Sequence, residues 1–383
     1  MKRLKPVTLI FIAISLVFVL CLPALWRSLQ QENKYHTWMH GEEPAWQGIL
    51  NLWHVAEWKT GKGSGVNYLK SVAMEYERST PGIFIEVQGL TAKEATEKMK
   101  AGEMPDLLSF PLGFDVLSEL ETMAVPANMK QALASSALLN GRCCALPYMM
   151  GGYLLMANRD LLYESQIELP LDGIWEADAL REAIAAGTHT GADGEGDVYG
   201  LACANERYTF SQAAILLYQQ QRVAGRAQEI LHEDAYEAFA QGKAALLLGS
   251  HYAYEAAIKA STEGMLDFEM YTLNNYTDMV QYIGIPAGEN EAKQASCHAF
   301  AAYLLSEKWQ RRLESLGVFP VLNMSVYEST LYELEDMLAE ALVPNTFSWA
   351  GQREAMLKES SSCLYDDESA QRILNSLYKV LSR

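Results

Sequence analysis

A glycine-rich loop, Gly61-Lys62-Gly63-Ser64-Gly65, is the segment whose residue types come closest to a known chemistry. The backbone N–H groups and the lysine of such loops hold phosphate in nucleotide-binding proteins. The required spacing is not met, because Gly63 follows Lys62 where Ser or Thr is needed, and Ala56 stands at the place of the first glycine. We therefore expect a flexible loop after a strand and no nucleotide site.

Three acidic residues, Asp193, Glu195 and Asp197, alternate with glycines like the start of a calcium-binding loop. That loop would need Gly in place of Val198 and Glu in place of Ala204. The seven histidines are scattered, and neither a zinc-protease motif nor a nucleophile elbow occurs. We therefore expect no metal, no cofactor and no enzyme activity.

The six cysteines form no CxxC pair and no zinc-finger spacing. Cys143 and Cys144 are adjacent, which favours two small buried hydrophobic side chains over a redox pair. The formal net charge of −18 repels a polyanion, so nucleic-acid binding is disfavoured.

Short apolar runs alternate with amphipathic helical patterns from Ile49 onward. The order is strand, helix, strand, helix, strand, expected at Ile49–Val55, Tyr68–Arg78, Ile83–Val87, Thr91–Ala101 and Leu107–Phe110. This order is typical of a parallel sheet covered by helices. Further strands are expected at Gly200–Ala204, Ala244–Leu248 and Gln281–Ile285, and further helices at Tyr236–Gln241, Ala295–Leu305, Lys308–Leu316 and Ser369–Leu381.

The N-terminal segment, residues 1–27, predicts export. Three basic residues precede Pro6–Trp26, a run without charge that is near the ~20 residues needed to span a bilayer. An uncleaved membrane anchor fits best. Lipidation at Cys21 fits less well, because Phe18-Val19-Leu20 is a poor lipobox, and cleavage is the third possibility. Residues 28–46 are polar and predict a linker.

Five sequence blocks, in order, resemble the extracellular solute-binding proteins of carbohydrate ABC importers, the group of the maltodextrin- and glycerol-phosphate-binding proteins. They are Trp53 with Pro81–Val87, Met104–Leu108, Asn140–Tyr148 with Gly152–Leu162, Phe239–Ala245, and Ala299–Ser306 with Gln310 and Gly317–Val321. Each block alone is a weak signal, whereas five blocks in the right order are a strong one.

The resemblance implies a two-lobed α/β periplasmic-binding-protein fold of type II, with the ligand between the lobes. Lobe 1 would comprise 47–149 and 283–320, and lobe 2 would comprise 150–282 and 321–383. Hinges would fall near 148–152, 283–285 and 319–322. The segment between Gln221 and Glu237 is shorter than the family's usual insertion, so the second lobe is expected to be trimmed.

Sugars present C–H faces to aromatic rings and hydroxyl groups to carboxylates and amides. Candidate ligand-binding residues are polar and aromatic residues at the ends of expected strands or at the hinges, together with positions implied by the resemblance. They are Trp53, Glu57, Trp58, Phe110, Tyr148, Tyr153, Glu206, Tyr208, Tyr252 and Trp349.

The resemblance implies a monomeric binding protein on the extracytoplasmic side of the cell membrane that delivers a sugar-like ligand to ABC permease subunits. A membrane-tethered sensor or partner-binding protein with the same fold is the alternative. A hydrolase or lyase without a recognisable motif is the third hypothesis.

Overall fold

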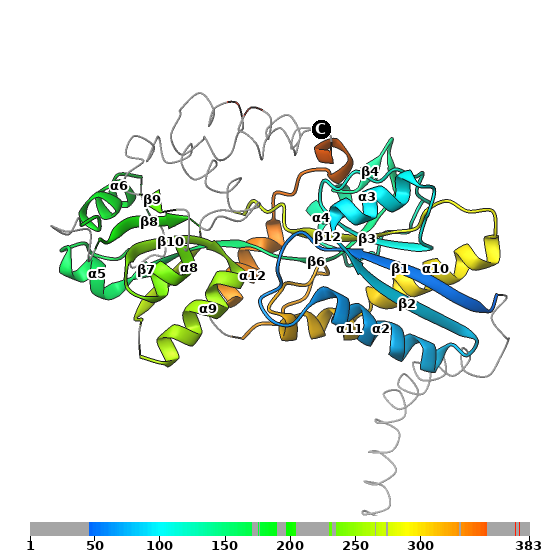
Figure 1. Cartoon of the computed structure of the whole chain (residues 1–383), viewed down its shortest axis with the longest axis horizontal. Helices are drawn as coiled ribbons and strands as arrows, with labels where there is room; N and C mark the ends of the chain where they lie inside the picture. Colours follow the sequence, from blue (N-terminus) through cyan, green and yellow to red (C-terminus); the bar gives the residue numbers. More distant parts are fainter. Residues whose placement is uncertain are drawn as a thin grey trace, which may run out of the picture.

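The computed structural model describes residues 46–170, 175, 177–189, 197–203, 230–231, 235–264, 266–272, 275–328, 331–350, 372 and 375. They form two α/β lobes side by side along the longest axis of the molecule (Figure 1). Each lobe is built on one five-stranded sheet. The two-lobed architecture expected from the sequence is present.

The first sheet has the order β2-β1-β3-β12-β6. Its strands are β1 (Gly48–Val55), β2 (Ile83–Leu90), β3 (Leu107–Pro111), β6 (Leu146–Met150) and β12 (Val280–Gly284). β1 pairs parallel with β2 and β3, whereas β12 runs antiparallel to both β3 and β6. The expected parallel sheet is therefore a mixed one.

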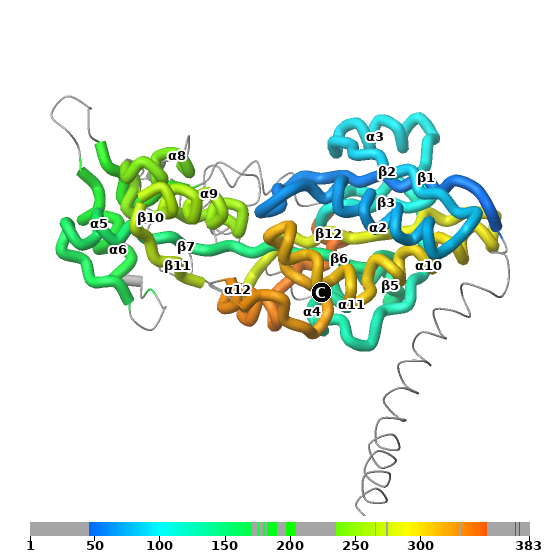
Figure 2. Tube along the Cα trace, turned by 90° about the horizontal axis from the view of Figure 1, so that it is seen from below, coloured from blue at the N-terminus to red at the C-terminus, as the bar shows by residue number. Residues whose placement is uncertain are grey.

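The helices of the first lobe bury apolar stripes against this sheet. α2 (Gly65–Ser79) begins at Ser64, whose hydroxyl accepts from the Asn67 N–H at 3.2 Å, and α3 (Ala92–Lys100) begins with a capping box between Thr91 and Glu94. Figures 1 and 2 show α3 apart from α2 and α10. The remaining elements are α4 (Gln131–Ser135), β4 (Leu138–Leu139), β5 (Arg142–Cys143), α10 (Glu291–Leu304), α11 (Glu307–Arg311) and the 3-10 helix η2 (Arg312–Leu316).

The second sheet has the order β11-β7-β10-β8-β9. Its strands are β7 (Tyr153–Asn158), β8 (Tyr199–Cys203), β9 (Ile230–Leu231), β10 (Ala244–Ser250) and β11 (Phe268–Thr272). The apolar run of β10 is buried at every residue, as expected for a central strand. The helices of the second lobe are α5 (Arg159–Glu164), α6 (Ala177–Ala186), α8 (Ala235–Ala240) and α9 (His251–Thr262).

The crossing segments between the sheets are hydrogen-bonded to one another. Met150 and Phe319 exchange backbone hydrogen bonds of 3.1 and 2.8 Å, and the Gly151 N–H donates to the Met279 carbonyl at 2.7 Å. The Thr277 hydroxyl donates to the Gly151 carbonyl at 2.8 Å. Three stretches far apart in sequence are thus joined at one point.

The second crossing lies earlier than the 283–285 expected from the sequence. β11 ends at Thr272 in the second sheet, and β12 begins at Val280 in the first, so the chain crosses between them. Tyr282 and Ile283 are already paired with β3 and β6. An apolar strand that is buried on both faces gives no sequence signal for which sheet it joins.

The chain beyond Val321 contacts both lobes. α12 (Leu331–Met337) and η3 (Leu338–Glu340) pack close to Gly152, and α12 also contacts β11. Farther on, the Thr346 N–H donates to the Ser136 carbonyl of the first lobe at 2.7 Å. The expected assignment of 321–383 to the second lobe alone is therefore incomplete, and the other lobe boundaries stay predictions.

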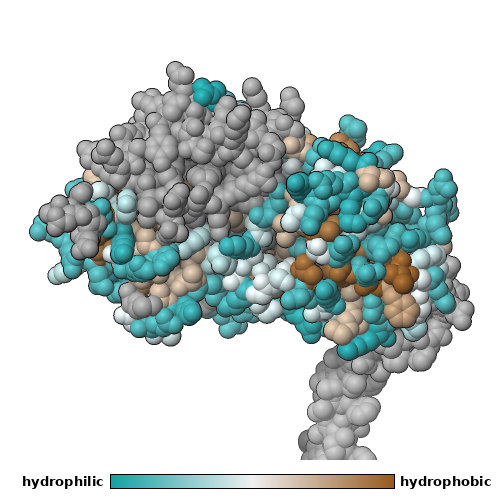
Figure 3. Space-filling view, in the orientation of Figure 1, coloured by the Kyte–Doolittle hydropathy of each residue, from teal (hydrophilic) through white to brown (hydrophobic). Residues whose placement is uncertain are grey.

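The surface visible in Figure 3 is mostly hydrophilic over the described residues, with brown apolar side chains grouped on the lobe of β1 and β2. Ile49 and Phe84, neighbours across these two strands, are 56% and 58% exposed. No helix among the described residues is long and apolar enough to cross a membrane. The expected anchor at 1–27 and the expected linker at 28–46, except for its last residue Trp46, lie outside those residues.

We predict that Gly151→Ala destabilises the protein by about 1–3 kcal/mol, the usual cost of overpacking. A Cβ at this position would lie 2.3 Å from Cε1 of the fully buried His251 ring, so the ring or the backbone would have to shift. Urea unfolding measures the effect. Gly288→Ala is the control, because its Cβ would meet only the end of the Gln294 side chain. Equal losses in the two variants would contradict the prediction.

Candidate functional site

The loop that follows β1 reaches the second lobe. The Trp58 ring, half-buried, meets His251 edge to face, with ring centroids 5.7 Å apart. Lys59 Nζ lies 4.8 Å from the ring centroid of Tyr252. We call Trp58, Lys59, His251 and Tyr252 the interlobe cluster. It lies at the carboxyl end of a parallel strand, where ligands bind in open α/β sheets.

This loop is held in place on its lobe 1 side. The Lys62 N–H donates to the Leu316 carbonyl at 2.7 Å, and the Thr60 hydroxyl donates to the Lys62 carbonyl at 3.0 Å. A Cβ on Gly61 would lie 2.9 Å from the Gly317 carbonyl oxygen, so the two backbones are in close contact. Lys62 also forms a 2.9 Å ion pair with Glu255 of α9. The glycines therefore serve close packing, and the loop expected to be flexible is bonded on both sides.

His251 is the centre of the interlobe cluster. It is fully buried at the start of α9, directly after the N-cap Ser250. The Gly152 N–H donates to its Nδ1 at 3.3 Å, and its ring lies 6.2 Å from that of Phe319. Burial lowers the pKa of His251 to about 4, against a smaller opposite effect of hydrogen bonding to the backbone of Gly152 and Lys59. The ring is neutral at pH 7 and contacts both lobes and a crossing segment.

A second buried polar contact lies at the crossings. The Tyr153 hydroxyl, at the start of β7, donates to the carboxylate of Asp278, and both residues are almost fully buried. Asp278 lies on the segment that leads into β12. This pair joins two of the crossing segments through side chains.

The candidate residues fall into different environments. Trp58, Tyr252 and Tyr153 lie at the boundary between the lobes, with the partly buried Glu57 beside Trp58. Glu206 and Tyr208 lie outside the described residues.

Trp53, Phe110 and Tyr148 are not brought to the interlobe cluster. Phe110 stacks on Tyr282 at 5.7 Å, and Lys98 of α3 lies over the Trp53 ring. The Tyr148 hydroxyl lies 2.9 Å from the Ser109 hydroxyl inside the lobe. Their rings pack in the core of the first lobe, because strand alternation turns them toward helices or neighbouring strands.

Trp349 is buried against the first lobe, with 1% of its surface exposed. Thr346, in the same helical stretch, accepts at its hydroxyl from the Gly113 N–H at 2.9 Å. The indole N–H groups of Trp349 and Trp58 are both buried and have no hydrogen-bond partner in the described structure. The indole N–H of the core residue Trp309 is in the same state, so these three tryptophans have an unused donor within the described part of the chain, and of these Trp58 lies in the interlobe cluster.

Sequence reasoning missed His251, Lys59 and Asp278. His251 had a usable signal, because it follows Ser250 at the end of the buried run of β10, where a helix begins. Asp278 had none, since its partner Tyr153 is 125 positions away. No group of three or more His, Cys, Asp or Glu residues that could hold a metal ion occurs in the described residues, where Cys143, Cys144 and Cys297 are free and buried and Cys203 is buried.

We predict that the free energy of unfolding decreases as pH falls from about 6.5 toward 4. Burial lowers the pKa of His251 and of His54 to about 4, below the ordinary value of 6.5, so between these values the unfolded chain binds more protons than the folded one. Each ring contributes on the order of 3 kcal/mol that is present above pH 6.5 and lost in acid.

Urea unfolding at pH 7 and pH 5 checks this expectation. His251→Gln should show a smaller decrease between the two pH values than the unmodified protein, because one titrating ring is gone. His298→Gln, at a partly exposed position of α10, should keep the full decrease. The same pH dependence in all three proteins would refute the assignment to His251.

The family model described as bacterial extracellular solute-binding protein matches residues 62–311. No curated protein sequence matches the chain.

Solved structures resemble the chain in fold. The GacH receptor of Streptomyces glaucescens, studied unliganded and with acarbose, has a TM-score of 0.60 at 16% identity, covering 88% of this chain and 99% of that one. The ABC substrate-binding protein Lmo0181 from Listeria monocytogenes, in complex with cycloalternan, has a TM-score of 0.63 at 11% identity, covering 87% of this chain and 98% of that one. The sugar-binding protein MalE from Xanthomonas citri has a TM-score of 0.62 at 15% identity, covering 88% of this chain and 98% of that one.

At these identities the structures show the fold, which is the two-lobed α/β fold of periplasmic binding proteins. The family model spans most of both lobes and includes the loop from Lys62, β10, and His251 with Tyr252. The chain belongs to the family of bacterial extracellular solute-binding proteins.

Proposed function

We propose that the chain is the extracytoplasmic substrate-binding component of an ABC importer and binds a saccharide between its lobes. Family membership supports the binding role and the extracytoplasmic location. Several proteins of the same fold are described with acarbose, cycloalternan or another sugar. The residues of the interlobe cluster support the choice of a saccharide.

Trp58 carries the proposal. Its half-buried ring comes from lobe 1 and meets His251 of lobe 2, and its indole N–H is buried without a partner. A buried donor without an acceptor costs about 1–3 kcal/mol, which a ligand hydroxyl would recover. Aromatic faces also suit the C–H faces of sugars. Tyr252, beside it on α9, supplies a second ring with a hydroxyl group.

Closure of the lobes would couple binding to delivery. A ligand that contacts Trp58 from one lobe and Tyr252 from the other binds the closed arrangement more tightly and shifts the population toward it. The permease would recognise that closed form. Residues 1–27 would tether the protein as an uncleaved anchor, with Cys21 lipidation as the other route, and the protein would act as a monomer.

We expect Trp58→Ala and Tyr252→Ala each to weaken saccharide binding tenfold or more, equal to about 1.4 kcal/mol. Isothermal titration calorimetry with maltotriose, acarbose and cycloalternan measures this. Tyr163→Ala is the matched control, because this ring of α5 is 84% exposed and distant in sequence from the cluster. Unchanged affinity in Trp58→Ala would remove this ring from the site, and a folded protein that binds no saccharide would refute the function.

A further inference from the structure

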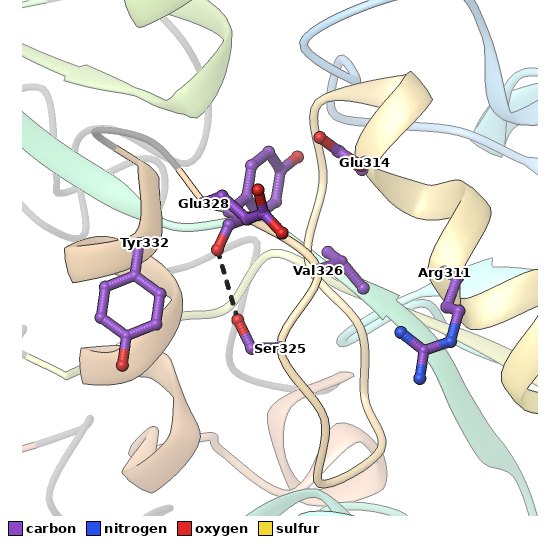
Figure 4. A pocket seen from close by; sticks show the side chains of 7 residues that line it. Arg311, Glu314, Ser325, Val326, Glu328 and Tyr332 are labelled. Carbon is purple, nitrogen blue, oxygen red and sulfur yellow. Dashed lines mark hydrogen bonds between the residues drawn. The ribbon is translucent and has the colours of Figure 1, made fainter.

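A pocket of about 530 Å³ lies outside the interlobe cluster, between α11 with η2 and α12. Figure 4 shows Arg311 and Tyr332 on opposite sides of the loop that carries Ser325, Val326 and Glu328, with Glu314 above them. Its lining residues are Arg311, Glu314, Ser325, Val326, Tyr327, Glu328 and Tyr332. None of these was a candidate from the sequence.

The floor of this pocket is rigidly built. The carboxylate of Glu335, only 3% exposed, accepts from the Ser325 hydroxyl at 2.6 Å and from the Val326 and Tyr327 N–H groups at 3.0 and 3.1 Å. The Tyr327 hydroxyl donates to the Val318 carbonyl at 3.1 Å. A buried carboxylate with three donors fixes the loop in one conformation, so the pocket does not depend on a ligand for its shape.

The walls carry charged groups that form no ion pair with any residue the structure describes. Lys308 and Arg312 both pair with Glu75. Arg311, between them in sequence, takes part in no ion pair within the described residues, and neither do Glu314 and Glu328. Opposite charges that lie around one hollow without pairing remain available to a ligand.

The chemistry of the walls indicates the ligand class. Carboxylate and guanidinium groups are planar and bind two neighbouring hydroxyl groups at once, as the vicinal hydroxyls of a sugar require. The ring of Tyr332, half of which is exposed, offers an apolar face beside them. Two carboxylates against one guanidinium disfavour a phosphorylated or otherwise anionic ligand. The volume is in the range of small-molecule sites.

We propose that this pocket is a second saccharide site, for a short neutral sugar, distinct from the interlobe cluster. One wall of the pocket is in contact with the crossing segments. A Cβ on Gly152 would lie 3.2 Å from the Leu334 side chain of α12 and 2.8 Å from the Leu338 side chain of η3. Occupation of the pocket therefore biases the position of α12 against Gly152. By linkage, binding in the cluster and binding in the pocket affect one another.

The test uses Trp58→Ala, with the cluster impaired, and the double variant Tyr332→Ala/Glu328→Gln, with the pocket impaired. Maltotriose and cycloalternan are titrated calorimetrically up to millimolar concentration. We expect two sites in the unmodified protein, one remaining in each variant, and at least tenfold weaker binding at the altered site. Glu333→Gln, an exposed residue of α12 that does not line the pocket, is the control and should keep both sites.

The two proposals fail separately. A single site that Trp58→Ala removes and the double variant leaves unchanged overturns the pocket and leaves the importer function standing. Binding that the double variant removes and Trp58→Ala leaves unchanged supports the pocket and refutes the role of the cluster. Thermal unfolding of each variant without sugar shows that it is folded, so lost binding is not lost structure.

Discussion

The absence of a side chain at Gly151 is the constraint on which the two-lobed arrangement depends. The His251 imidazole occupies the space where a Cβ of Gly151 would lie. The backbone of Gly151 is hydrogen-bonded to Met279 and Thr277. Next to it, Met150 is bonded to Phe319. One residue position thus fixes a crossing segment, the start of α9 and, through His251, the ring of Trp58. Any larger residue would separate parts that have to meet for the lobes to share a ligand.

The same packing explains why the His251 ring is buried in its uncharged form. A protonated ring without a counter-charge would be costly in so apolar an environment, and Trp58 and Phe319 lie on its sides. Charge is instead placed at the rim, where Lys62 and Glu255 join the lobes in contact with water. The surroundings of His251 are therefore uncharged and aromatic, the Asp278 carboxylate is buried beside them in its hydrogen bond with Tyr153, and the Lys62–Glu255 ion pair lies at the edge.

Local patterns were sufficient to predict the first half of lobe 1. The helical spacing of Tyr68, Leu69 and Val72 and the alternation in Ile83–Val87 reflect contacts with near neighbours, so β1 to β3 could be identified. The place of β12 between β3 and β6 could not, because an apolar strand carries no mark of its partners. The same holds for the boundary between the lobes: Trp58 and Tyr252 follow strands and were candidates from the sequence, and their contact with a ligand stays a prediction, whereas Asp278 is placed by its hydrogen bond to a distant tyrosine. Phe110 and Tyr148 have the same residue types as ligand-binding rings but face the core.

The position of β12 also bears on the order in which the molecule is made. This strand separates β3 from β6 in the finished sheet, yet it is synthesised more than a hundred residues after both. Until Gly284 has left the ribosome, the first lobe lacks a central strand, and β3 and β6 have exposed edges and no native partner between them. Contacts of such large sequence separation form slowly. The first sheet consequently cannot be completed until most of the chain has been synthesised, which delays the folding of the first lobe.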